Sequence, residues 1–89
     1  MGTLVCIKPD GTEERIEAKK PDYEVLNRLV GGYIERVRVR YEGRIRDCYV
    51  NEDGFRLTLE PNEHIRSKLA GVFEHYQGVI LGNGVVWVP

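Results

Sequence analysis

Apolar and basic residues alternate in the middle of the chain, between positions 33 and 41. The alternating residues are Arg36, Val37, Arg38, Val39, Arg40 and Tyr41. Successive side chains of a strand point to opposite faces, so this period of two predicts a strand with one buried face and one basic face. Glu42-Gly43 then marks a turn, and residues 44–50 return as the second strand of a hairpin.

An earlier hairpin is predicted at the start of the chain. Residues 4–8 are apolar at successive positions, a pattern typical of a strand that is covered on both faces. Pro9-Asp10-Gly11 suits a tight turn, because Pro favours its first central position and Gly the left-handed one. Residues 12–18 then form the returning strand.

Two helices are predicted. The first has Pro21 and Asp22 in its opening turn and an apolar side that ends at Gly31-Gly32, where glycine supplies a left-handed cap. The second begins at the N-cap Asn62 and ends either near Ala70, because Gly71 disfavours a helix, or at Gln77, and the longer form is preferred. Its apolar stripe consists of Ile65, Leu69, Val72, Phe73 and Tyr76.

The remaining segments complete the expected sheet. Asn51 to Gly54 reads as a turn, and residues 55–59 read as a strand with Phe55, Leu57 and Leu59 on one side. Asn83-Gly84 is a strong hairpin signal within residues 79–88. We therefore predict one α+β domain over residues 1–89, a mostly antiparallel sheet built from hairpins with two helices packed on one face. The opening order of hairpin, helix and hairpin suggests a β-grasp-like arrangement.

The register of the central hairpin decides where its arginines point. A two-residue turn at Glu42-Gly43 would place Arg40 opposite Ile45 and mix apolar with basic residues on each face. A three-residue loop from Tyr41 to Gly43 would place Arg40 opposite Arg44 and Val39 opposite Ile45. A one-residue slip moves every side chain to the other face, so burial should select one register.

Burial favours the three-residue loop. Each buried β-branched side chain contributes about 1.5–3 kcal/mol, whereas like charges that face each other across strands cost on the order of 0.2–1 kcal/mol. In this register one face carries all the arginines of the hairpin. They are the candidate binding residues Arg36, Arg38, Arg40, Arg44 and Arg46.

Three interpretations of this arginine face remain open. It can be a solvated face that the chain's own carboxylates neutralise, a surface that recognises a protein, or a β-ribbon that binds nucleic acid. The chain holds 13 Lys and Arg against 14 Asp and Glu, and this balance disfavours a strong binder of polyanions. A Val-rich edge strand also allows self-association.

The sequence supplies no ingredients for catalysis or for a cofactor. It contains no nucleophile elbow, P-loop, zinc-protease motif or dinucleotide fingerprint, so we predict that the protein is not an enzyme. No Cys or His spacing predicts a metal site, and Cys6 and Cys48 are expected to be buried reduced thiols. No apolar run is long enough to cross a membrane and no signal peptide is evident, so a cytoplasmic location is expected.

Four short motifs resemble a known family. They are Val30-Gly31-Gly32-Tyr33-Ile34-Glu35, Val50-Asn51-Glu52-Asp53-Gly54, Pro61-Asn62 and Ile80-Leu81-Gly82-Asn83. The chain resembles small phage, prophage and plasmid proteins that are classed as a domain of unknown function. The resemblance implies an accessory protein of a mobile element and assigns no catalytic residues. Together with the arginine face it predicts a module that binds a protein partner, such as a host factor, with nucleic-acid binding as the alternative.

Overall fold

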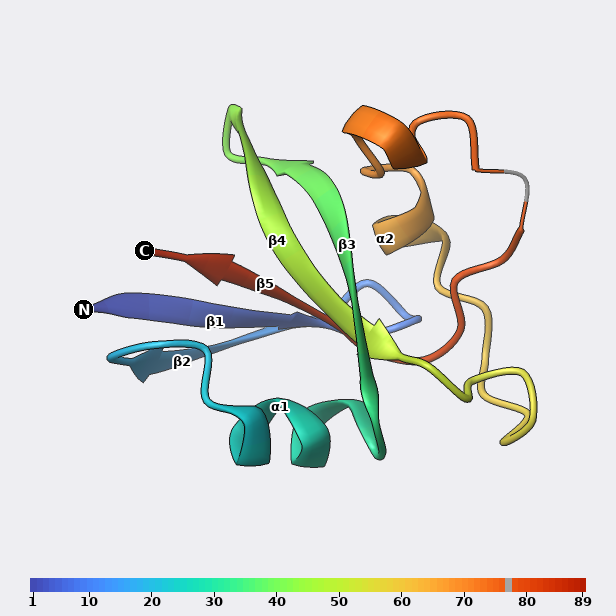
Figure 1. Cartoon of the computed structure of the whole chain (residues 1–89), viewed down its shortest axis with the longest axis horizontal. Coiled ribbons are helices and arrows are strands. Elements are labelled where there is room, and N and C mark those ends of the chain that lie inside the picture. Colours follow the sequence, from blue (N-terminus) through green and yellow to red (C-terminus); the bar gives the residue numbers. More distant parts are fainter. Residues whose placement is uncertain (77) are drawn as a thin grey trace.

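The computed structural model, which describes residues 1–76 and 78–89, is built on a five-stranded sheet (Figure 1). The strands lie in the order β2-β1-β5-β4-β3, and all four pairings are antiparallel. Their bounds are Gly2–Ile7 (β1), Glu13–Ala18 (β2), Ile34–Tyr41 (β3), Arg44–Asn51 (β4) and Gly84–Val88 (β5). The helices are Tyr23–Val30 (α1), Glu63–Arg66 (α2) and the 3-10 turn Gly71–Phe73 (η1). The predicted α+β class is confirmed, and the chain opens with the expected hairpin, helix and hairpin.

The first hairpin and α1 form as predicted, except that Pro21 and Asp22 lie just before the first turn of α1 and not inside it. The carboxylate of Asp22 accepts a hydrogen bond from the backbone N–H of Glu24 at 2.9 Å and so caps α1, with Pro21 just before the cap. At the other end of the helix, Gly31 adopts a left-handed conformation, with φ of 81°. Residues 4–7 of β1 are buried on both faces, as the apolar run predicts.

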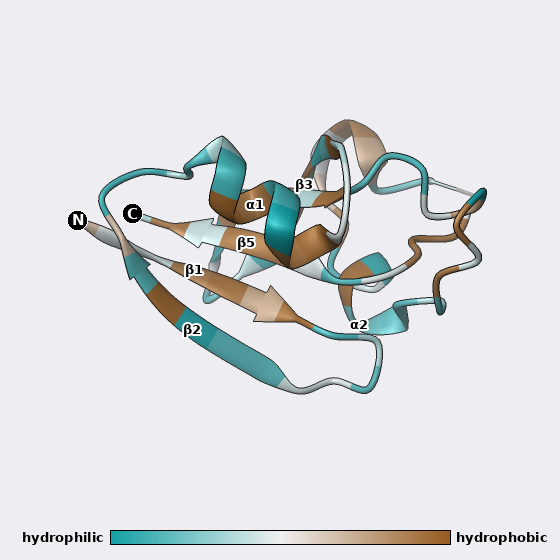
Figure 2. Cartoon of the chain, turned by 90° about the horizontal axis from the view of Figure 1, so that it is seen from below, coloured by the Kyte–Doolittle hydropathy of each residue, from teal (hydrophilic) through white to brown (hydrophobic). Residues whose placement is uncertain are grey.

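The helices cover opposite faces of the sheet, so the prediction that they share one face is wrong. On one face, Leu26 and Val30 of α1 pack on Leu4, Cys6 and Val85. On the other face, Ile65 of α2 packs among residues that include Val5, Ile7 and Val86. The central strands β1 and β5 are apolar on both faces, and each face therefore needs its own cover. Figure 2 shows α1 against the apolar strands, beside the mostly hydrophilic edge strand β2.

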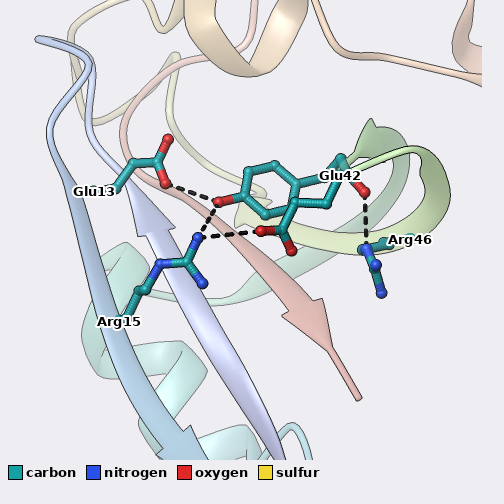
Figure 3. Close-up of polar contacts among 5 residues, drawn as sticks. Glu13, Arg15, Glu42 and Arg46 are labelled. Atoms are coloured by element: carbon teal, nitrogen blue, oxygen red, sulfur yellow. Dashed lines mark hydrogen bonds and ion pairs between the residues drawn. The ribbon is translucent and has the colours of Figure 1, made fainter.

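The sheet curls so that its two edge strands meet on the α2 side. The Tyr41 hydroxyl, at the end of β3, donates a hydrogen bond to Glu13 of β2 at 2.8 Å (Figure 3). The same hydroxyl accepts one from Arg15 at 2.9 Å, and Arg15 also pairs with Glu42 at 3.5 Å. These contacts, which we call the clasp, join the first hairpin to the tip of the second.

Residues 55–59 do not form the predicted strand. Consecutive turns occupy this segment, with hydrogen bonds from the N–H of Leu57 to the carbonyl of Asp53 and from Leu59 to Gly54. Phe55 is 84% exposed. The alternating apolar residues therefore have no sheet to pack against, because β5 takes the place beside β4.

The predicted second helix is interrupted. It begins at Asn62 as expected, but α2 ends at Arg66 because the next residues pair with the outer edge of β3. Arg40 donates its N–H to the carbonyl of Lys68 at 2.7 Å, and the N–H of Ala70 bonds to the carbonyl of Arg38 at 2.9 Å. Gly71 follows with φ of 65°, a left-handed conformation that no helix continues. The predicted end of the helix, Gln77, lies outside the described residues.

Asn83-Gly84 does not form a hairpin turn, so that prediction is also wrong. Asn83 instead donates its side-chain amide to the carbonyl of Leu29, at the end of α1, at 3.0 Å. Gly84 begins β5, which inserts between β1 and β4. A Cβ at Gly84 would lie 2.5 Å from a side-chain carbon of Ile65, so this close approach requires glycine.

Candidate interaction surface on the central hairpin

The β3–β4 hairpin has the two-residue turn, and the predicted three-residue loop is wrong. Tyr41 pairs with Arg44, and Arg38 pairs with Asp47. The turn residues Glu42 and Gly43 have φ of 51° and 76°, the two positive values of the turn type that matches strand twist. Turn geometry therefore sets the register here.

This register divides the five candidate arginines between two faces. Arg36, Arg38 and Arg40 lie on the α1 side of the sheet, together with Ile45 and Asp47. Arg44 and Arg46 lie on the α2 side, opposite Tyr41 and Val39. The predicted continuous face of five arginines is therefore not present.

Acidic side chains of the chain pair with the arginines on the α1 side. Asp47 lies between Arg38, at 3.2 Å, and Arg36, at 4.0 Å. Arg40 reaches across to Glu74 at 3.1 Å. All three arginine side chains are about half exposed or more, and exposed pairs of this kind contribute only about 0–1 kcal/mol each. A carboxylate from outside could therefore replace the internal one at little cost.

The two arginines on the α2 side lack carboxylate partners among residues 1–76 and 78–89. Arg46 donates its Nε to the backbone carbonyl of Tyr41 at 2.9 Å, as Figure 3 shows. The exposed guanidinium of Arg44 takes part in no hydrogen bond or ion pair with the described residues. Positive charge at the hairpin tip is thus left available to an anionic group.

A hollow opens beside these arginines because β4 and β5 diverge. The two strands pair only at Cys48 with Val86 and at Tyr49 with Val85, although β4 extends back to Arg44. The space between them has a volume of about 270 Å³. It is lined by Arg38, Arg44, Ile45, Arg46, Trp87 and Pro89, together with Asp47. A hollow lined by both guanidinium groups and apolar side chains can accept an acidic group attached to an apolar one.

A second hollow was missed by sequence reasoning. It measures about 320 Å³, and its lining includes Phe55, Tyr76, Glu35 and Glu52. The sequence placed Phe55 on a strand and Tyr76 on a helix, so nothing brought them together. The only sequence signal for this hollow is weak: it is the presence of two aromatic residues in segments that are rich in turn-forming residues.

Other reactive groups in the described residues are buried or scattered. Cys6 and Cys48 are free and buried, as predicted. Burial raises the pKa of the Cys48 thiol to about 12 and also raises the pKa of Cys6, so the nucleophilic thiolate is disfavoured at neutral pH. Over the described parts of the chain, His, Cys, Asp and Glu nowhere gather in threes that could hold a metal ion. None of the helices described there has the length and apolar character needed to span a membrane.

The fold and this surface define a small α+β domain whose central hairpin carries arginines on both faces. The chain belongs to the family described as a domain of unknown function (DUF3846), whose model matches residues 2–88. No curated protein and no solved structure matches the chain. The resemblance seen in the sequence is confirmed at the level of a domain of unknown function.

The motifs that carried this resemblance have structural roles. Gly31 ends α1, and Asn51 donates its side-chain amide to the carbonyl of Val30 at 2.9 Å. The carbonyl oxygen of the same side chain accepts the N–H of Asp53 at 2.7 Å. A Cβ at Gly32 would lie 3.0 Å from the Asn51 amide nitrogen, so glycine allows this contact. The motifs join the end of α1 to the end of β4, which accounts for their residue types without a catalytic role.

Proposed function

We propose that the protein is a non-enzymatic protein-binding module, whose partner contacts the β3–β4 hairpin through the arginines beside the hollow. One observation carries the proposal: Arg44 has no partner among residues 1–76 and 78–89, and it lines a hollow together with the apolar side chains of Ile45 and Trp87. Arginine beside exposed apolar and aromatic groups is typical of protein contact surfaces. In line with the family resemblance, the module serves as an accessory protein of a phage or other mobile element and acts in the host cytoplasm on a host factor.

Binding of a partner carboxylate should require little free energy, because it exchanges one ion pair of an exposed arginine for another. Arg38 already pairs with Asp47 at 3.2 Å, and the arginine side chain is 47% exposed. A partner carboxylate can join or replace Asp47 without burying an unpaired charge. Arg44, which is unpaired among the described residues, gains a carboxylate, so the net change in pairing favours the complex.

Nucleic acid is the second candidate for the same surface. Phosphates would pair with Arg44 and Arg46, and Asp47, which lines the same hollow, would repel a phosphate as it would a carboxylate. Nucleic-acid binding further predicts an affinity that falls steeply with salt, in proportion to the number of phosphates neutralised.

A capture experiment with matched variants tests the proposal. The Arg44→Ser/Arg46→Ser protein and the control Arg28→Ser/Arg56→Ser lose the same charge, the control at sites away from the hollow. We expect host proteins retained by the wild type to be retained by the control and lost by the hairpin variant. Retention of the same proteins by both variants would contradict the proposal. A mobility shift with DNA or RNA at about 50 mM salt, lost in the hairpin variant, would favour nucleic acid instead.

A further inference from the structure

We infer that the partner segment is an extended peptide with acidic side chains, which adds as a strand to the free edge of β4 at Ile45. This inference rests on the proposed function and specifies how the hairpin binds. Strand addition uses main-chain hydrogen bonds for affinity and alternate side chains for specificity. Where β4 diverges from β5, the main-chain groups of Ile45 are open, and Arg44 and Arg46 flank it with side chains on the other face.

The backbone of Ile45 points away from β3, and none of the described residues forms a backbone hydrogen bond with it. Arg38 and Arg40 direct their backbone hydrogen bonds outward, to Ala70 and Lys68. Opposed residues of an antiparallel pair are either both bonded to each other or both directed away. Ile45 is opposite Arg40, so its N–H and C=O point away from β3, toward the β5 side. Pairing with β5 starts only at Cys48, and the described residues give Ile45 no backbone partner.

Side chains along this edge set the sequence of the peptide. Arg44 and Arg46 flank Ile45 and lie on the α2 side, whereas Ile45 lies on the α1 side and is 44% exposed. A strand added beside them also alternates its faces. Its acidic residues would therefore occupy alternate positions opposite the arginines, and apolar residues between them would pack on Ile45 and Trp87, which line the same hollow.

The edge strand β2 does not suit this peptide. Strand β2 pairs only with β1, and its residues include Glu13, Glu14 and Glu17. An acidic strand would meet like charges there, which destabilises pairing. Charge thus directs an acidic segment to β4. A nucleic acid has no backbone that supplies alternating N–H and C=O groups, so the free edge favours a peptide.

The probe is a synthetic, fluorescein-labelled octapeptide that alternates Glu with Val and Thr. Two further peptides keep its charge but carry N-methyl groups on alternate residues. In one peptide the methyl groups lie on the edge that would bond to β4, and in the other they lie on the opposite edge. Methyl groups on the bonding edge should weaken binding roughly tenfold per hydrogen bond removed, and those on the other edge should have little effect. Fluorescence anisotropy measures the affinities, and protection of the Ile45 amide from hydrogen exchange locates the contact.

The outcomes separate the mode of binding from the surface. Equal affinity for all three peptides, lost in Arg44→Ser/Arg46→Ser but not in Arg28→Ser/Arg56→Ser, would overturn strand addition while leaving the arginine surface intact. Absence of peptide binding would overturn the inference, and the capture experiment would still judge the proposed function separately. Dimerisation that protects the Ile45 amide without peptide would also overturn it, because a second copy would occupy the edge.

Discussion

Asn62 joins three separate segments, so its replacement by alanine should strongly destabilise the fold. Its side chain is fully buried and donates hydrogen bonds to the carbonyls of Ile7 and Gly82, both at 2.9 Å. Its side-chain oxygen accepts the N–H of Ile65 at 3.0 Å and so caps α2. One residue therefore ties the end of β1, the segment before β5 and the helix together.

The expected loss follows from these three bonds. Alanine leaves two carbonyls and one N–H without the Asn62 partner, and each buried group left unsatisfied costs about 1–3 kcal/mol. The missing N-cap alone costs about 1 kcal/mol. We expect a total loss of about 3–5 kcal/mol, a large share of the roughly 4–13 kcal/mol that a chain of this length has.

Urea unfolding, followed by Trp87 fluorescence and by circular dichroism, measures the free energy of unfolding. Asn83→Ala is the matched control, because it removes a single bond to Leu29 and should cost about 0.5–1.5 kcal/mol. If the Asn62→Ala protein does not fold, Asn62→Ser retains an acceptor for the cap and should lie between it and the wild type. A loss below about 1 kcal/mol for Asn62→Ala, with an unchanged m value, would refute the reasoning.

Three further predictions concern the clasp, the hairpin turn and the buried thiol. Tyr41→Phe removes hydrogen bonds to two charged side chains and should lower the free energy of unfolding in urea by about 1–3 kcal/mol. An unchanged free energy of unfolding would show that the clasp does not form. Gly43→Ala should lower the free energy of unfolding by about 1–2 kcal/mol, because φ there is 76°. The added Cβ meets no residue beyond its chain neighbours within 4 Å, so the backbone conformation alone accounts for this loss. The pKa of Cys48 is raised from 9.0 to about 12, so its stabilising contribution is complete below pH 9 and is lost as pH rises toward 12. Cys48→Ala should therefore show a shallower loss of stability between pH 9 and 10.5 than the wild type, and parallel curves would contradict this.

Local signals predicted the strands and the helix of residues 2–51, although not the register of the second hairpin. The turn at Pro9 to Gly11 and the left-handed Gly31 each act within a few residues, so sequence spacing alone identifies them, whereas Asp22 lies just before the first turn of α1 in which it was predicted. Strand bounds on either side of Glu42-Gly43 follow equally from alternation and turn chemistry. The candidate arginines were found for the same reason, because they are part of that alternation.

Long-range pairing determined the rest and could not be read from local patterns. Asn83-Gly84 has the residues of a hairpin turn, but β5 pairs with β1, some eighty residues away in sequence. Leu69 lies at helical spacing from Ile65, yet it forms a bridge with Val39 that ends the helix. In each case a distant strand edge offered backbone hydrogen bonds that outweighed a local preference.

The register of the central hairpin shows which energy was misjudged. The three-residue loop is favoured only if the whole hairpin buries one face, because Ile45 then contributes the full free energy of a buried side chain. Ile45 is instead 44% exposed, and this removes much of the energy that was expected to select the register. The smaller energies of cross-strand charge pairs then favour the two-residue turn, because it places Arg38 opposite Asp47 and avoids pairing Arg40 with Arg44. The same incomplete burial leaves Ile45 accessible beside the hollow, so the residue whose burial the sequence overestimated lies in the surface that we propose for binding.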